Sequence, residues 1–83
     1  MTELKTREKW LHDISEVLVG RTIKSARYMS KEEVKSNMWY KSAVVLTLDD
    51  GNIIYPMADD GANDAGAIGT SYDKLLIIPT LRT

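Results

Sequence analysis

The segment from residue 43 to residue 60, AVVLTLDDGNIIYPMADD, has two strand-like apolar runs on either side of Asp50-Gly51. Glycine adopts positive φ without steric cost and aspartate tolerates the left-handed region, so this pair predicts a β-hairpin with a type I′ turn. A two-residue or a four-residue loop would place Leu48 opposite Ile53. In that register, one face of the sheet carries Val44, Leu46, Leu48, Ile53, Tyr55 and Met57. The other face is also largely apolar, so we expect cover on both faces.

Two helices are predicted around this hairpin. Residues 2–19 have apolar side chains at helical spacing, with Thr2 as N-cap and Gly20 at the position of a terminating glycine. The stripe consists of Leu4, Leu11, Ile14 and Leu18, widened by Trp10 and Val17. Ser30 and Glu33 have the spacing of a capping box, which predicts a short second helix over residues 30–36.

Further strands are expected at residues 21–29 and 75–79. The first alternates imperfectly, because Ile23 and Tyr28 would fall on opposite faces. Residues 58–71, rich in glycine, alanine, Asp and Asn, are expected to form a long loop. The chain is thus predicted to be a single α+β domain over residues 1–83. An N-terminal helix would pack on a small, curled, mainly antiparallel sheet of four or five strands, with an SH3-like sheet as one form.

Composition limits the function classes. The chain lacks cysteine, has one histidine, and carries a formal net charge of −1, which does not favour strong nucleic-acid binding. Residues 1–41 hold nine of the eleven Lys and Arg residues, whereas residues 42–73 hold six aspartates and no basic residue. We expect no membrane span and a cytoplasmic location. No serine has an identifiable base and no nucleotide-binding motif is present, so an enzyme is not expected.

The acidic loop is the candidate cation site. Asp59, Asp60, Asn63 and Asp64 offer the oxygen ligands that hard divalent cations take, although the spacing is not that of an EF-hand. The alternative is that these side chains cap local backbone N–H groups. No other cofactor is expected. His12, flanked by Glu8 and Glu16 at helical spacing, is interpreted as part of an exposed helix face rather than as a metal ligand.

Trp39 and Tyr40, between Lys35 and Lys41, are the candidate partner-binding residues. An aromatic pair beside basic side chains suits a peptide or a single-stranded base. The alternative for Trp39 is a place in the core, since a small domain must bury its few large aromatic side chains.

Three motifs resemble one family. They are G-R-T-I-x-S-x-R-Y-M-S-K-E-E from Gly20 to Glu33, L-D-D-G from Leu48 to Gly51, and Y-P-x-x-D-D from Tyr55 to Asp60. The chain resembles small uncharacterised proteins of bacteria and marine phages in which such a hairpin precedes an acidic loop. The resemblance implies one compact domain and no particular activity.

The predicted function is therefore a non-catalytic protein-binding or adaptor module, with a homodimer through an exposed strand edge as one form of the interaction. The first alternative is a cation-binding module that uses residues 59–64. The second is weak nucleic-acid binding through the basic first half of the chain.

Overall fold

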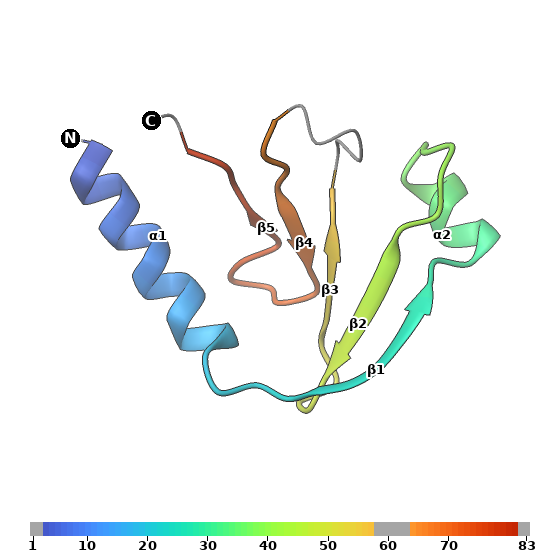
Figure 1. Ribbon diagram of the computed structural model, residues 1–83, viewed down its shortest axis with the longest axis horizontal. Helices are drawn as coiled ribbons and strands as arrows, with labels where there is room; N and C mark the ends of the chain where they lie inside the picture. Colours follow the sequence, from blue (N-terminus) through green and yellow to red (C-terminus); the bar gives the residue numbers. More distant parts are fainter. Residues whose placement is uncertain (1–2, 58–63, 82–83) are drawn as a thin grey trace.

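The computed structural model describes residues 3–57 and 64–81, and these form an α+β fold with two helices and an antiparallel sheet (Figure 1). The elements in chain order are α1 (Glu3–Leu18), β1 (Ile23–Tyr28), α2 (Lys31–Ser36), β2 (Val44–Leu48), β3 (Ile53–Pro56), β4 (Ile68–Thr70) and β5 (Ile77–Ile78). The predicted class, the N-terminal helix, the short second helix and the sheet are confirmed.

The sheet is an open meander. Its strand order is β1-β2-β3-β4-β5, and every neighbouring pair is antiparallel. Among the described strands, β1 and β5 are therefore the edges. An SH3-like form of this sheet stays a prediction.

The hairpin between β2 and β3 turns through a three-residue loop, not through the predicted type I′ turn. The Gly51 N–H donates to the Leu48 carbonyl (3.0 Å), and the Leu48 N–H donates to the Asn52 carbonyl (2.8 Å). Gly51 has φ 86°, whereas Asp50 is not among the residues with positive φ. A type I′ turn needs positive φ at both central residues, while the three-residue loop needs it only at the glycine. The Asp50 carboxylate also accepts from the Asn52 N–H (3.0 Å), which secures this turn.

The predicted register of this hairpin is wrong by one residue. Thr47 lies opposite Ile53, and Leu46 lies opposite Ile54. Because side chains alternate with a period of two, a shift of one residue moves a whole strand's side chains to the other face. Ile53 and Tyr55 thus share a face with Val45, which is fully buried, and not with Leu46 or Leu48 as predicted.

Strand β1 contains a β-bulge, so the faces predicted for its side chains are wrong. Ile23 pairs with Leu48, but the next pair joins Ser25 to Thr47, so Lys24 is an extra residue. The extra residue restores the phase, and Ile23 and Tyr28 lie on the same face instead of opposite faces. All six side chains of β1 are exposed, as befits an edge strand.

Strand β4 lies inside the segment that was predicted to be a loop, so that prediction is wrong for residues 68–70. Gly69 and Thr70 are buried, and β4 pairs with β3 on one side and β5 on the other. The Thr70 hydroxyl donates to the Leu75 carbonyl, and this hydrogen bond holds the segment that connects β4 to β5. The two neighbouring strands provide hydrogen-bond partners for the backbone of β4, although the residues of β4 have little tendency to form a strand.

The helices lie at opposite ends of the sheet (Figure 1). Helix α1 runs beside the C-terminal segment, where Trp10, Leu11 and Ile14 line one hollow together with Pro79 and Leu81. Within residues 3–57 and 64–81, neither helix is long and apolar enough to cross a membrane. Helix α2 sits at the far end of β1 and β2, and it positions the site described next.

Candidate functional site

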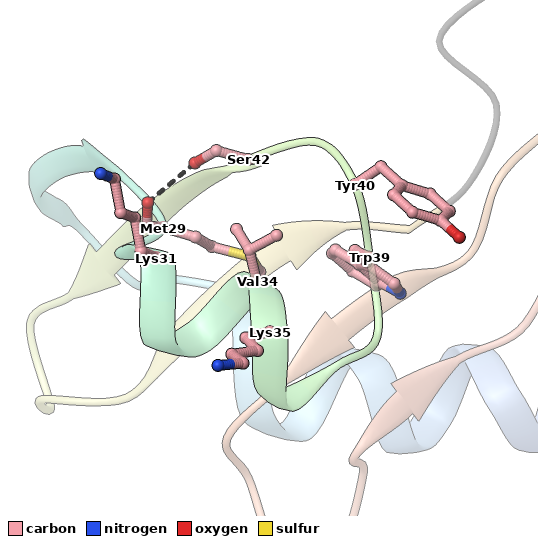
Figure 2. Close-up of a pocket in the computed structure, with 7 residues that line it drawn as sticks. All are labelled: Met29, Lys31, Val34, Lys35, Trp39, Tyr40 and Ser42. Atoms are coloured by element: carbon pink, nitrogen blue, oxygen red, sulfur yellow. Dashed lines mark hydrogen bonds between the residues drawn. The ribbon is translucent and has the colours of Figure 1, made fainter.

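A hollow of about 320 Å³ lies between α2 and the segment that leads into β2 (Figure 2). We call it the α2 hollow. It is open to solvent on one side and brings together residues from three parts of the chain: the end of β1, helix α2 and the residues before β2. It is lined by Met29, Lys31, Val34, Lys35, Trp39, Tyr40 and Ser42. The structure thus places both predicted partner-binding residues, Trp39 and Tyr40, on one hollow.

The end of α2 turns Trp39 back towards the helix. The Met38 N–H donates to the Lys35 carbonyl (3.0 Å) and the Trp39 N–H donates to the Val34 carbonyl (3.0 Å), which is the hydrogen-bond pattern of a Schellman motif. Met38 occupies the left-handed position of this motif, with φ 61°. Glycine usually fills that position, so the motif gave no signal in the sequence. This motif brings Trp39 into the lining of the hollow together with Val34.

The indole of Trp39 rests on the sheet. Its ring meets the Tyr55 ring edge to face, with centroids 6.2 Å apart and planes inclined at 64°. Tyr55 in turn lies over Gly69, where an added Cβ would stand 2.7 Å from the tyrosine oxygen and closer still to two ring carbons. Trp39 is consequently half-buried, partly core and partly wall of the hollow.

The two residues next to Trp39 in the sequence are exposed. Tyr40 is fully exposed (102 %) and Met38 is 89 % exposed. Buried Met29 forms the floor of the hollow: its N–H donates to the Ala43 carbonyl (2.9 Å), and its carbonyl accepts from the Ser42 hydroxyl (2.8 Å). The floor and the Trp39 wall are thus anchored to the sheet, whereas Tyr40 projects away from it (Figure 2).

The start of α2 is held by the predicted capping box, which is confirmed. The Glu33 N–H donates to the Ser30 hydroxyl (3.2 Å), and the Ser30 N–H donates to the Glu33 carboxylate (2.8 Å). Arg27 of β1 adds a two-pronged ion pair to the same carboxylate, at 2.7 and 3.0 Å. These hydrogen bonds, first from Arg27 and then from the Ser30 backbone, lower the pKa of Glu33 to about 2.

The lysines of α2 have no such partner. Within the described residues, neither Lys31 nor Lys35 lies within salt-bridge distance of a carboxylate. Glu33, between them in sequence, is already engaged by Arg27 and Ser30. In Figure 2 the two lysines stand on one side of the hollow and the aromatic rings of Trp39 and Tyr40 on the other. The hollow therefore combines an apolar floor with a basic rim.

A separate polar cluster fastens the hairpin turn to the β4–β5 connection. The Tyr72 hydroxyl donates to the Asp50 carboxylate (2.7 Å), and Arg21 lies 3.5 Å from the same group. The hydrogen bond from Tyr72 is the main cause that lowers the pKa of Asp50. Burial, followed by the bond to Asp50, raises the pKa of Tyr72. Nearby, the Ser71 hydroxyl donates to the Asn52 side chain (2.9 Å). These groups satisfy one another and stabilise the turn.

The predicted cation site falls mainly on residues about which the structure says nothing. Asp59, Asp60 and Asn63 lie outside the described residues. Asp64 is exposed, and its carboxylate accepts from the Ala65 N–H (2.8 Å), the kind of local bond named as the alternative. Divalent-cation binding by this loop stays a prediction.

A second acidic group was only partly anticipated. His12, Asp13 and Glu16 of α1 place possible ligand atoms within 4.8 Å of one another, and His12 lies 3.0 Å from Glu16. Asp13, rather than Glu8, is the third member of this group. His12 and Glu16 are exposed on the helix surface, in agreement with the interpretation of an i,i+4 surface pair.

Comparisons of the chain with protein-family models, with curated proteins and with solved structures found no match. The resemblance to small bacterial and phage proteins accordingly stays a prediction.

Proposed function

We propose that this chain is a non-catalytic protein-binding module and that the α2 hollow is its contact surface. The observation that carries the proposal is the full exposure of Tyr40 in the lining of a hollow with an apolar floor. Apolar and aromatic side chains left exposed around a depression are typical of interaction sites, and Tyr and Trp are enriched among residues that dominate binding energy. A cytoplasmic location stays a prediction.

The frame of the hollow supports the same proposal. The capping box and the Arg27–Glu33 pair hold the start of α2, while the Schellman motif and the Trp39–Tyr55 contact hold its end. A surface that is already ordered loses little conformational entropy when a partner binds.

Self-association through the edge strand β1 is the weaker form of the proposal. Two copies paired antiparallel about the centre of β1 would set Lys24 of one copy opposite Arg27 of the other. Like charges directly opposite one another destabilise a strand pair, and lysine on an edge strand is a common protection against such pairing. A partner at the α2 hollow meets no such obstacle.

Site-specific photo-cross-linking tests the proposal. A photoreactive amino acid would replace Tyr40 at the hollow and, as the matched control, Leu76, which is exposed (57 %) in the connection between β4 and β5. We expect a discrete protein adduct from position 40 in cells and none from position 76. Identical adducts from both positions, or no adduct from position 40, would overturn the proposal.

A further inference from the structure

We infer that the segment bound by the α2 hollow is a peptide segment with one apolar side chain flanked by acidic residues. The inference rests on the proposed function and names the chemistry of the partner. It follows from two properties of the same surface: the size of its apolar floor and the uncompensated charge of its rim.

The floor suits an apolar anchor of one or two side chains. Met29, Val34 and the half-buried Trp39 provide apolar surface in a hollow of about 320 Å³ that is open on one side. Small-molecule sites of that size ordinarily enclose most of the ligand surface. An open depression of this volume instead resembles the pockets that receive single anchor residues of a partner chain.

The rim favours negative charge around that anchor. Lys31 and Lys35 are four residues apart on α2, and this spacing puts both on one side of the helix. Of the two carboxylates of α2, Glu33 is paired with Arg27, and Glu32 forms no ion pair with either lysine within the described residues. A segment with acidic residues beside its anchor would complete this charge pattern, and such complementarity contributes chiefly to specificity and association rate.

A single-stranded nucleic acid fits the same surface less well. Proteins that bind single strands follow the phosphate backbone with an extended basic groove, in addition to stacking bases on aromatic rings. Here two lysines line the hollow, Glu32 lies on the same short helix, and the whole chain has a formal net charge of −1. The observations therefore favour an acidic peptide, and the nucleic acid becomes an outcome of the test.

The test uses the full chain and a fluorescent synthetic peptide with a central leucine between pairs of aspartates. Comparison peptides replace the leucine with glycine or the aspartates with lysines, and a thymidine oligonucleotide is the nucleic-acid probe. The protein variants are Lys31→Gln/Lys35→Gln and the control Lys24→Gln/Lys74→Gln, which changes the net charge equally at exposed positions outside the hollow. Thermal unfolding of each variant checks that it is folded.

We expect saturable binding of the acidic leucine peptide, loss of binding with either comparison peptide, and about a three- to tenfold weaker affinity for Lys31→Gln/Lys35→Gln, since exposed ion pairs contribute little each. The control variant should bind like the unmodified chain. Equal binding of the acidic and basic peptides, or an equal effect of both double variants, would overturn the inference. So would tighter binding of the oligonucleotide, or a dimer that the hollow variant dissociates.

The two proposals can fail separately. If photo-cross-linking at position 40 captures a protein whose adduct yield is unchanged by Lys31→Gln/Lys35→Gln, the binding function stands and the acidic-segment inference is overturned. If position 40 captures nothing and no peptide binds, both are overturned.

Discussion

Replacing Gly69 with alanine is expected to destabilise the protein, although the same change at an ordinary strand position would stabilise it. Gly69 does not have positive φ, so its backbone accommodates alanine, and the reduced entropy of the unfolded chain alone would contribute about 0.4–1 kcal/mol of stability. The new Cβ, however, would lie 2.7 Å from the Tyr55 oxygen and closer to two of its ring carbons. The ring must move, and the Trp39 ring packs against it.

Overpacking of this kind costs about 1–3 kcal/mol, which exceeds the entropic gain. We expect a net loss of about 1–2 kcal/mol, equivalent to a Tm lower by roughly 4–16 °C for a chain of this length. Urea unfolding followed by tryptophan fluorescence gives the free energy of unfolding, and near-ultraviolet circular dichroism reports the displaced aromatic pair. The background Tyr55→Leu lacks the atoms that clash, so there Gly69→Ala should stabilise. A stabilising effect of Gly69→Ala in the unmodified chain would refute the reasoning.

Three further results are expected. Met38→Gly should raise the free energy of unfolding by up to about 1 kcal/mol in thermal or urea unfolding, because it removes left-handed strain from an exposed side chain, whereas Met38→Ala should not. The folded pKa of Glu33, about 2, lies below its ordinary 4.5, so its stabilisation is complete above about pH 4.5 and is lost as the pH falls towards 2. In a plot of Tm against pH, Glu33→Gln should therefore reduce the loss of Tm over that pH interval, whereas Glu32→Gln should leave it unchanged. Asp50→Asn should lower the raised pKa of Tyr72, followed by phenolate absorbance; an unchanged titration would contradict the hydrogen bond as a cause.

Local sequence signals predicted those features whose partners are close in the chain. The capping box joins Ser30 to Glu33 across three residues, and the structure reproduces it. The positive φ of Gly20 after α1 was likewise expected from its position. In the candidate site, the sequence singled out Trp39 and Tyr40 as an aromatic pair beside lysines. Their partners Met29 and Val34 carried no such signal, because apolar residues at these positions look like ordinary core.

Features that depend on distant partners were not predictable in the same way. The register of the β2–β3 hairpin depends on the number of residues in its turn. The two loop lengths considered for Asp50-Gly51 both gave the same wrong pairing. Strand β4 exists because β3 and β5 bind both its sides and because Gly69 admits the Tyr55 ring. None of these conditions can be read from residues 68–70 alone.

By itself, the sequence determined an α+β chain, its two helices and the location of its central hairpin, since helical periodicity, caps and turn glycines act over a few residues. Tertiary structure alone decided the faces of the sheet, the fourth strand and the α2 hollow. The hollow needs Met38 in a left-handed conformation that its residue type disfavours, and the folded chain maintains it through the hydrogen bonds that end α2 and the packing of Trp39 on Tyr55.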